Sequence, residues 1–375
     1  MINGNNFNSL HHTPKILVTP LDWGLGHATR CIPIINELIY HHCEVIIAAS
    51  GEGFFLLKKE FPALVILRIN TYKISYSRRR SLLLLKLVAQ VPAMAISIWK
   101  EKLWLDKIIK KYKIDAVISD NRPGMNSKKI TSVYITHQLL IKTGNIFFEK
   151  IAQKIHYHLI KQFTYCWVPD YKENGLAGEL SHQENSPSNV LYIGPLSRFE
   201  LLTDMPNKYD VLVSISGPEP QRTIFEKKIF SQLKNYNKKV LFVRGLPTEH
   251  ESLKTENELI QILNHLPADE LNKAFQESKI VISRSGYTTI MDLIKLGKNA
   301  VLVPTPGQTE QEYLSNYLMK KNIFYSVTQD RFSLDKINNY TSAMQPVKMA
   351  QGMDNYKQVI SDFLVALNTG NFQTQ

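Results

Sequence analysis

Short runs of apolar residues alternate along this chain with stretches whose apolar positions recur at helical spacing. Lys15–Pro20 (KILVTP) predicts a first buried strand, residues 32–39 predict one face of a helix, and Glu44–Ala49 (EVIIAA) predicts a second strand. A strand, a helix and a strand in this order favour a parallel sheet. Further strands are predicted at residues 65–69, 115–119, 132–136, 165–168 and 190–193.

A second series of the same kind follows residues 194–207, whose proline and polar content is typical of a linker. Strands are predicted at residues 209–215, 239–243, 259–263, 279–283 and 300–304, with helices at 222–233, from about 290 to Gly297, and from about Glu310. We therefore expect two α/β domains, residues 13–198 and 199–375, with the last helix able to pack back on the first domain.

The turn Arg284-Ser285-Gly286 joins a predicted strand to a predicted helix. A helix N-terminus presents unpaired N–H groups and the positive end of a dipole, so it suits a phosphate. Thr288 and Thr289 add small hydroxyl groups beside this turn. Asp292 lies on the same helix, where its carboxylate could accept hydrogen bonds from two sugar hydroxyls.

The stretch from Arg284 to Asn316 resembles the nucleotide-sugar site of MurG-type transferases (glycosyltransferase family 28) and their GT-B relatives. This resemblance implies an α/β protein of the GT-B fold, with two Rossmann-like domains whose parallel sheets face an interdomain cleft. It also implies donor-binding roles along the stretch. Tyr287, Thr288 and Thr289 would form the diphosphate turn, Asp292 would bind the ribose, and Gln308, Gln311 and Glu312 would line the sugar side.

Two of these positions depart from the family pattern. The ribose residue is Asp292 where glutamate is usual, and Glu312 stands where the second of two paired glutamines is usual. The first change shortens the reach by one methylene, and the second bears on which sugar the donor carries.

A second glycine turn, Gly24-Leu25-Gly26-His27, follows the first predicted strand. It lacks the third glycine of a dinucleotide fingerprint, since Thr29 stands there, and no acidic residue ends the second strand, which disfavours NAD. It resembles instead the glycine loop of the same transferase family. On that resemblance Gly24, Gly26, Arg30 and His137 belong to the acceptor side.

Sugar transfer needs a base that takes the proton of the acceptor hydroxyl, and positive charge that stabilises the leaving diphosphate. Histidine titrates near neutrality, so His27 is the first candidate base; Asp22 is the alternative and His137 a reserve. The resemblance implies that Asp120 orients His27, because GT-B relatives often pair such a histidine with an aspartate at a later strand end. Asp120 could instead serve as a cap of a turn. The chain contains no D-x-D pattern for a metal-held diphosphate. We therefore expect helix N-termini and cations to balance it, with Arg244, Arg284 and the Ser216-Gly217 turn as candidates.

Composition adds one feature. The 375 residues carry a net charge of +12, and twelve basic residues lie between Arg68 and Lys113 against two acidic ones. Residues 82–99 are apolar but include Lys86, Gln90 and Pro92, which disfavours a spanning helix. Residues 78–113 then form either a buried helix pair with a solvated basic face or a peripheral contact with an anionic leaflet. No nucleic-acid-binding pattern accompanies the charge.

The sequence thus predicts an inverting, metal-independent glycosyltransferase without a cofactor, which moves a sugar from a UDP-sugar to a lipid-linked or cell-envelope acceptor. The alternatives are a UDP-sugar hydrolase or 2-epimerase on the same fold, or a non-catalytic nucleotide-sugar-binding protein. Three scattered cysteines and a polar N-terminus without an apolar run favour a cytoplasmic protein, with a possible peripheral place on the inner face of the membrane.

Overall fold

The computed structural model describes residues 13–70, 80–142, 145–247, 249, 251, 253–342, 347 and 352–369, and within these ranges it leaves out the side chains of residues 80–89, 146, 341 and 342. The chain divides into two compact units. The first contains Met1–Gly175, Glu179–Pro195 and Asp354–Gln375, and the second contains Leu176–Gly178 and Leu196–Met353. The boundary between the two units therefore lies after Pro195, three residues before the expected boundary after residue 198.

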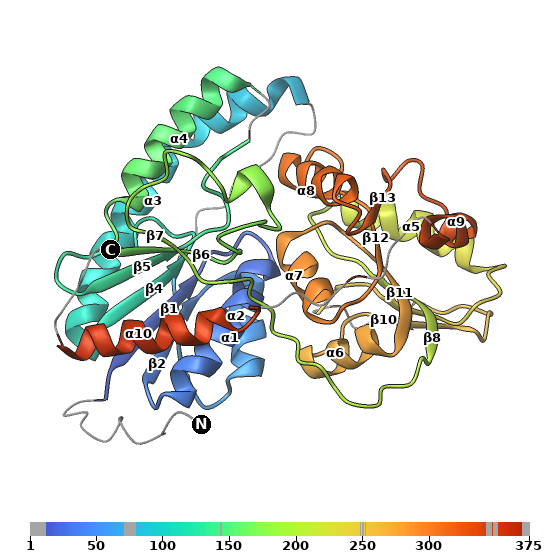
Figure 1. Ribbon diagram of the computed structural model, residues 1–375, viewed down its shortest axis with the longest axis horizontal. Coiled ribbons are helices and arrows are strands. Elements are labelled where there is room, and N and C mark those ends of the chain that lie inside the picture. The colour runs from blue at the N-terminus through green and yellow to red at the C-terminus, as the bar shows by residue number, and fades with distance from the viewer. Residues whose placement is uncertain are drawn as a thin grey trace. The chain divides into compact units, whose positions relative to one another are not determined.

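The first unit is built on a parallel sheet whose described strands have the order β3-β2-β1-β4-β5-β6-β7 (Figure 1). These strands are β1 (Lys15–Pro20), β2 (Glu44–Ala49), β3 (Val65–Arg68), β4 (Ala116–Asp120), β5 (Thr131–Ile135), β6 (Tyr165–Val168) and β7 (Val190–Tyr192). The helices are α1 (Leu25–Tyr40), α2 (Gly51–Glu60), α3 (Arg80–Tyr112), α4 (Ile146–Ile160) and α10 (Asn355–Thr369), with a 3₁₀ turn at Gly178–Leu180.

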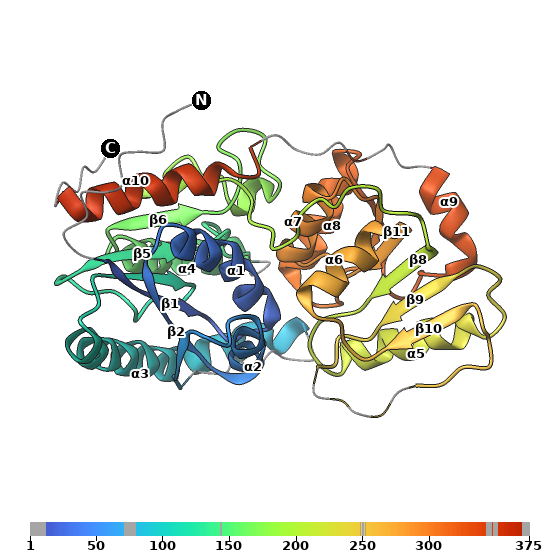
Figure 2. The same ribbon diagram turned by 90° about the horizontal axis from the view of Figure 1, so that it is seen from below.

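Helices cover both faces of this sheet, which explains why its central strands are almost entirely apolar. Successive side chains of a strand point to opposite faces. On β6, Cys166 and Val168 join a buried cluster with Ile160 at the end of α4, whereas Trp167 meets Phe363 of α10 edge to face, with ring centroids 5.4 Å apart. Figure 2 shows α10 lying beside α1 and β6, so the last helix packs on the first unit.

The basic and apolar segment forms one long helix, α3, and the expectation of a helix pair was wrong. Pro92 lies inside the helix but is exposed, where water can hydrogen-bond the carbonyl that loses its N–H partner. The C-terminal half packs on the sheet through Leu105, with Trp104 and Ile108 partly buried against the same cluster. Arg78 and Arg79, which belong to the proposed membrane segment, lie outside the described residues.

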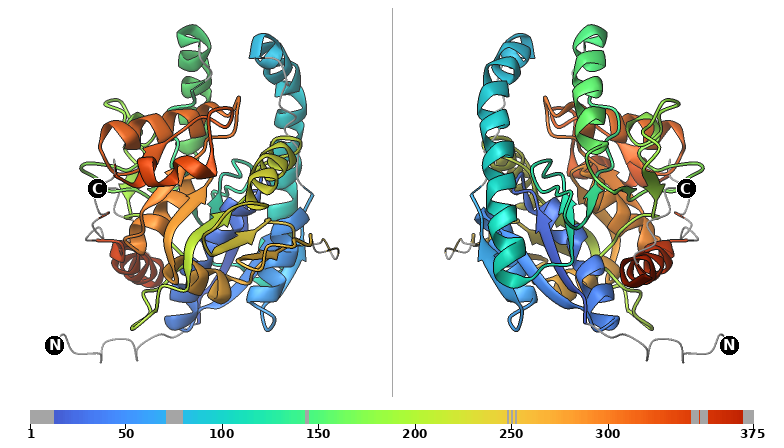
Figure 3. Two further views of the ribbon diagram at one scale, coloured as in Figure 1. Left: turned by 90° about the vertical axis from the view of Figure 1, so that its right-hand side faces the viewer. Right: turned by 90° about the vertical axis from the view of Figure 1, so that its left-hand side faces the viewer.

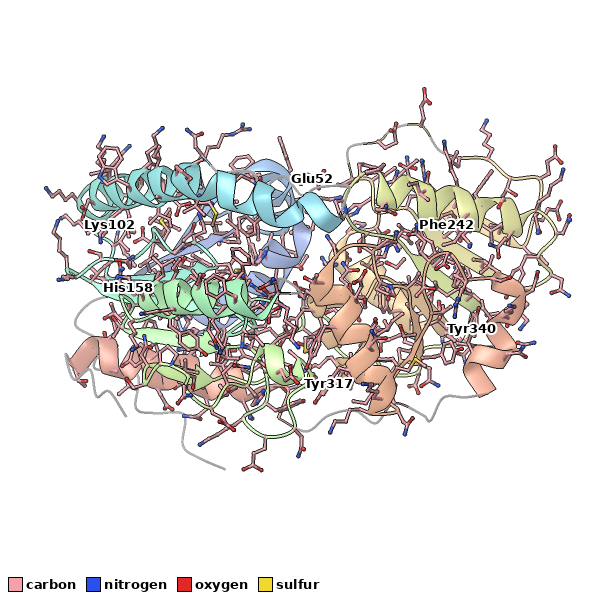
Figure 4. The ribbon with its side chains drawn as sticks, turned by 90° about the horizontal axis from the view of Figure 1, so that it is seen from above. Glu52, Lys102, His158, Phe242, Tyr317 and Tyr340 are labelled. Carbon is pink, nitrogen blue, oxygen red and sulfur yellow. The ribbon has the colours of Figure 1, made fainter. Side chains whose placement is uncertain are left out.

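The second unit is built on another parallel sheet, with the described strands in the order β10-β9-β8-β11-β12-β13. Its core places Phe242 of the sheet among residues of α5 and α9, and Figure 4 labels Phe242 and Tyr340 of this core. The strands are β8 (Tyr209–Ser214), β9 (Val240–Val243), β10 (Ile260–Leu263), β11 (Ser278–Ser283), β12 (Ala300–Leu302) and β13 (Tyr325–Ser326). The helices are α5 (Gln221–Leu233), α6 (Ala268–Gln276), α7 (Tyr287–Lys295), α8 (Thr309–Lys320) and α9 (Ile337–Ser342), with a 3₁₀ turn at Leu334–Lys336.

The predicted fold class, two α/β domains with parallel sheets, is confirmed. Each predicted strand is present within two residues of its expected bounds. Helices α2, α4 and α6 were not predicted. Helix α4 leaves Phe147, Ile151 and Ile155 exposed, so its apolar pattern does not mark a buried face.

Candidate functional site

The carboxyl ends of neighbouring strands gather one set of predicted residues in the first unit. In the sheet register Pro20 at the end of β1 pairs with Asp120 at the end of β4, and Asp120 pairs with Ile135 at the end of β5. Helix α1 starts a few residues after β1, behind Gly24, whose φ of 109° favours glycine. His27, Asp120 and His137 therefore lie at the same edge of the sheet.

His27 and Asp120 form a hydrogen-bonded pair, as predicted. Nδ1 of His27 lies 2.8 Å from Oδ1 of Asp120; the histidine side chain is 14% exposed and the aspartate fully buried. Burial alone would raise the pKa of Asp120, but the charges and hydrogen bonds of Arg30 and His27 lower it to about 2. Asp120 is therefore an ionised acceptor at neutral pH, which orients the imidazole.

Arg30 connects this pair to His137. Its Nε and one terminal nitrogen donate to the two carboxylate oxygens of Asp120, and its other terminal nitrogen lies 2.7 Å from Nδ1 of His137. Arg30 is 2% exposed and His137 is 5% exposed. Cys31 also contacts the carboxylate, with Sγ 3.8 Å from Oδ2 of Asp120.

Asp22, the alternative base, lies at the start of helix α2. A Cβ on Gly51, the first residue of α2, would be 2.1 Å from Oδ2 of Asp22, so the carboxylate packs directly on that backbone. A carboxylate at a helix N-terminus is stabilised by the helix dipole. This placement gives Asp22 a structural role, while Gly26 accepts a hydrogen bond from the Thr29 hydroxyl at the turn before His27.

The second unit gathers the predicted donor residues in the same way. Strands β8, β11 and β12 are neighbours, and α5, α7 and α8 begin just beyond their carboxyl ends. Ser216 and Gly217 form an exposed turn, in which Gly217 has a φ of 109°. Helix α7 begins behind Gly286 with no side-chain cap. Its start is therefore suited to an anionic ligand.

The three residues at the start of α7 differ in exposure. Tyr287 is buried, and Thr288 and Thr289 are half-buried. Ser285, also buried, donates its hydroxyl to the backbone oxygen of Gln311, 2.9 Å away. This bond ties the start of α7 to the first turn of α8.

The side chains expected on the sugar side hold the proline loop before α8. Oε1 of Gln311 accepts from the backbone N–H of Thr305 at 2.9 Å, and its Nε2 donates to Gln308 at 2.5 Å. Oε1 of Glu312 accepts from the N–H of Gly307 at 2.9 Å. These contacts fix the loop backbone, so in this structure Gln311 and Glu312 shape the site through the loop.

Arg244, a candidate for the diphosphate, is held in a buried ion pair. Nε and one terminal nitrogen donate to Glu226 at 3.0 and 3.1 Å, and the other terminal nitrogen donates to Asn264 at 2.7 Å. Arg222 donates to the same Glu226 carboxylate. Arg222 also pairs with Glu219, so two arginines face two carboxylates in a network that connects α5 to the end of β9. The structure thus engages Arg244 inside the unit, and its role toward the diphosphate stays a prediction.

Arg284 is also buried, 1% exposed, and stacks over the Phe225 ring at 4.3 Å. It donates to Gln329, to the carbonyl of Gln221 and to the carbonyl of Val303. Among the described residues no carboxylate pairs with it, and burial lowers its pKa to about 10. Its guanidinium therefore places a positive charge behind the strand ends without reaching the surface.

Asp292 lies buried on α7, where the Ser197 hydroxyl donates to its Oδ1 at 2.6 Å and the backbone N–H of Arg198 donates as well. Burial raises the pKa of Asp292 to about 6, against the opposing effect of Arg198. The carboxylate thus also anchors the start of the linker. No local sequence pattern indicates this contact, because Ser197 lies 95 residues away in the chain.

Thr305 was not among the predicted site residues. It follows β12 between two prolines, is 1% exposed, and its hydroxyl has no hydrogen-bond partner among the described residues. A Cβ on Gly217 would be 3.3 Å from this hydroxyl, so the glycine turn after β8 packs directly on it. A threonine between prolines in a loop is the one signal that could have marked it.

Helices α3 and α4 carry the basic and apolar surface of the first unit. Both extend in the same direction past the end of the sheet (Figure 3). Ile96, Trp99 and Leu103 are exposed on α3, and Phe147, Ile151 and Ile155, spaced four residues apart, are exposed on α4. Lys102 and His158 flank these faces and are labelled in Figure 4.

A cavity with a volume of about 750 Å³ lies beside α4, and three lysines of this helix and its end line it: Lys150, Lys154 and Lys161. No described helix is both long and apolar enough to span a bilayer. Within the described residues, no cluster of three or more histidine, cysteine, aspartate or glutamate side chains could hold a metal ion.

Residues 222–366 match the family model of the glycosyltransferase family 28 C-terminal domain. An uncharacterized glycosyltransferase of Methanosarcina acetivorans is 23% identical over 321 residues, 80% of this chain and 81% of the relative. The UDP-N-acetylglucosamine--N-acetylmuramyl-(pentapeptide) pyrophosphoryl-undecaprenol N-acetylglucosamine transferase of Bradyrhizobium sp. (strain BTAi1) is 31% identical over 105 residues, 27% of each chain.

Solved glycosyltransferases share the fold. The calicheamicin glycosyltransferase CalG4 superposes with a TM-score of 0.64 at 12% identity, over 96% of this chain and 99% of that one. Acinetobacter baumannii MurG superposes with a TM-score of 0.55 at 14% identity, over 94% and 99% of the two chains. The resemblance inferred from residues 284–316 is confirmed, and so is the GT-B fold.

The buried Asp292 carboxylate should make stability depend on pH. Its folded pKa of about 6 lies above the ordinary aspartate value of about 3.9, so the folded protein binds more protons between these values. Stability should therefore fall as pH rises from about 4 to about 6 and stay level above. Asp292→Asn cannot titrate, so the difference in unfolding free energy between wild type and variant should change by roughly 2–3 kcal/mol across this window.

Urea unfolding at several pH values between about 4 and 7 measures this difference. Asp269→Asn, at an exposed carboxylate of the same unit, serves as the control and should follow the wild type. Parallel pH profiles for wild type and Asp292→Asn would contradict the raised pKa.

Proposed function

We propose that this chain, which has the GT-B fold and whose residues 222–366 match the glycosyltransferase family 28 C-terminal domain, is a glycosyltransferase that moves a sugar from a UDP-sugar to a lipid-linked acceptor with inversion at the transferred carbon. The observation that carries this proposal is the His27–Asp120 pair at the carboxyl edge of the first sheet. A buried, ionised aspartate fixes Nδ1 of the histidine as a donor and leaves Nε2 as the basic nitrogen. A base for an acceptor hydroxyl needs this arrangement.

The proposed transfer is a single displacement. Nε2 of His27 takes the proton of the acceptor hydroxyl while the oxygen forms a bond to the anomeric carbon of the donor sugar. The bond from that carbon to the diphosphate oxygen breaks on the opposite face, and UDP leaves with the electron pair. Asp120 stabilises the imidazolium that forms, since it is already ionised and faces Nδ1.

The second unit would bind the donor. The N-terminus of α7 at Gly286 lacks a side-chain cap, so its backbone N–H groups can receive the diphosphate. The buried Arg284 guanidinium adds positive charge behind the same strand ends without a balancing carboxylate among the described residues. We propose that these groups, and not a metal ion, balance the charge of the leaving UDP.

The donor and acceptor classes come from the relatives. The Bradyrhizobium relative is by name a transferase of UDP-N-acetylglucosamine to a pyrophosphoryl-undecaprenol saccharide, and the match lies in a quarter of this chain. We therefore propose UDP-N-acetylglucosamine and a polyprenyl-pyrophosphate saccharide as the first donor and acceptor to test. Glu312, which departs from the usual glutamine, holds the loop backbone and leaves the donor sugar open to a screen.

A lipid-linked acceptor requires access to a bilayer, and the first unit offers a surface for it. Exposed Trp99 of α3 and exposed Phe147, Ile151 and Ile155 of α4 can insert between headgroups, while the lysines beside them meet lipid phosphates. Trp104 of the same helix packs on the core instead. We propose that α3 and α4 together rest on an anionic cytoplasmic leaflet.

The donor proposal predicts a proton release. Ribose hydroxyls would hydrogen-bond the ionised form of Asp292, whose pKa is about 6, so UDP binding at about pH 6 should expel a proton. Calorimetry in two buffers of different ionisation enthalpy measures this. Asp292→Ala should weaken UDP binding by about 1.5–3 kcal/mol, the range for a hydrogen bond to a charged group.

Ser197→Ala is the matched control, because it removes the hydroxyl that Asp292 binds and leaves the carboxylate. UDP affinity should survive this change. Equal losses in both variants would mean that Asp292 only anchors the linker, and an unchanged affinity in Asp292→Ala would place the nucleotide elsewhere.

The catalytic proposal predicts that His27→Ala lowers turnover by about 10²–10⁴-fold while UDP affinity is kept. The assay follows UDP release from UDP-N-acetylglucosamine with and without a pyrophosphoryl-undecaprenol saccharide. Release only with the acceptor supports a transferase; equal release without it indicates the hydrolase. EDTA should leave the rate unchanged, and inhibition reversed by a divalent ion would refute the metal-free step.

The membrane proposal predicts binding to anionic vesicles that weakens in high salt, because surface charges are screened within about 8 Å at physiological ionic strength. The double variant Phe147→Ser and Ile151→Ser should reduce this binding in a sedimentation assay. Val365→Ser, at an equally exposed apolar residue on α10, is the control and should bind like the wild type. Equal binding to neutral and anionic vesicles, or none to either, would contradict the proposal.

A further inference from the structure

One guanidinium contacts both histidines of the first unit's carboxyl edge. Arg30 of α1 donates to Asp120, and its two terminal nitrogens lie 2.7 Å from Nδ1 of His137 and 2.9 Å from Nδ1 of His27. These contacts join α1, the end of β4 and the segment after β5. Arg30 is 2% exposed, so water does not compete for its donors.

The contact to His137 fixes the position of that residue's proton. A guanidinium has N–H donors and no acceptor, so Nδ1 of His137 must be the acceptor at 2.7 Å. A neutral imidazole with Nδ1 as acceptor carries its proton on Nε2. His137 could therefore take up a second proton only by giving up its bond to Arg30.

The contacts of His27 lead to the opposite tautomer. Its Nδ1 lies within hydrogen-bond distance of both Oδ1 of Asp120 and a terminal nitrogen of Arg30. Asp120 is ionised and can only accept, so Nδ1 of His27 donates to it. The Arg30 nitrogen finds its own acceptor in the same Asp120 oxygen. Nε2 of His27 is then unprotonated and basic.

We propose that Arg30 is a positioning residue that holds His137 as an Nε2–H donor while Asp120 holds His27 as an Nε2 base, so that the two histidines have opposite roles. His137 is then a hydrogen-bond donor to an oxygen of the acceptor, such as a hydroxyl or phosphate oxygen, and not a second base. The assignment of tautomers stands on the contacts alone, whereas the role toward the acceptor rests on the proposed transfer.

Nitrogen NMR of the free protein tests the tautomers without any substrate. With ¹⁵N-labelled histidine at about pH 8, above the ordinary histidine pKa of about 6.5, His27 should show a protonated Nδ1 and His137 a protonated Nε2. Spectra of His27→Gln and His137→Gln assign the signals. A protonated Nδ1 on His137 in the wild type would overturn the proposal at once.

Two variants should then distinguish the effect of Arg30 on His137 from the effect of Asp120 on His27. Arg30→Lys keeps the charge but not the guanidinium fork, so His137 should become a mixture of tautomers while His27 keeps its proton on Nδ1. Asp120→Asn should release His27 and leave His137 fixed. If both histidines change together in each variant, Arg30 has no specific role; if a variant does not fold, the wild-type spectrum still decides.

Kinetics test the donor role. The amide nitrogen of glutamine can stand in for Nε2–H, so His137→Gln should keep the acceptor KM within a few-fold of the wild-type value. His137→Ala should raise it about tenfold, the loss expected for one hydrogen bond. Equal defects in both variants would overturn the donor role, and a failure of transfer in the wild type would refute the proposed function without touching the tautomers.

Discussion

The buried carboxylate of Asp120 is the interaction on which the first unit's site depends. A fully buried, unpaired aspartate would be strongly destabilising or would take up a proton. Arg30 removes that penalty, because its guanidinium donates to both carboxylate oxygens and lowers the pKa to about 2. Only an ionised Asp120 can hold Nδ1–H of His27. The arginine therefore stabilises the fold and, through the aspartate, sets the protonation of the candidate base.

The buried charged side chains of the second unit are paired in a different way. Arg222 and Arg244 share the Glu226 carboxylate, and Arg222 also pairs with Glu219. Arg284 donates to carbonyls and an amide and stacks on the Phe225 ring, but its buried Nε has no hydrogen-bond partner among the described residues. All three guanidiniums are engaged inside the unit, so the proposed anion binding would rely on the backbone at the start of α7, with the buried charge of Arg284 behind it. In the proposed transfer, the first unit would therefore act through ionised side chains, and the second unit would bind the diphosphate through helix and loop backbone.

Much of the fold could be predicted from the sequence, because buried parallel strands are short apolar runs and the glycine turns lie at their ends. The His27–Asp120 pair was predicted from the resemblance to GT-B transferases, and the structure forms it because His27 follows, and Asp120 ends, neighbouring buried strands. The contacts that the side chains of Arg244, Arg284 and Asp292 make inside the second unit could not be predicted. Their contacts inside the unit are with Glu226, Gln329 and Ser197, which lie 18, 45 and 95 residues away in the chain, and no local pattern encodes such pairs.

The exposure of apolar side chains on the surface helices could not be predicted from the sequence either. Sequence patterns assign an apolar stripe to the interior, yet on α4 Phe147, Ile151 and Ile155 face solvent. On α3 Trp99 is exposed, whereas Trp104 packs on the core. A contiguous apolar patch at the surface marks a site of interaction with a partner or a membrane. Lysines line the cavity beside α4, and a partner that is apolar inside and anionic at its surface fits both features. A bilayer has that construction, and it is also where a polyprenyl-linked acceptor would lie.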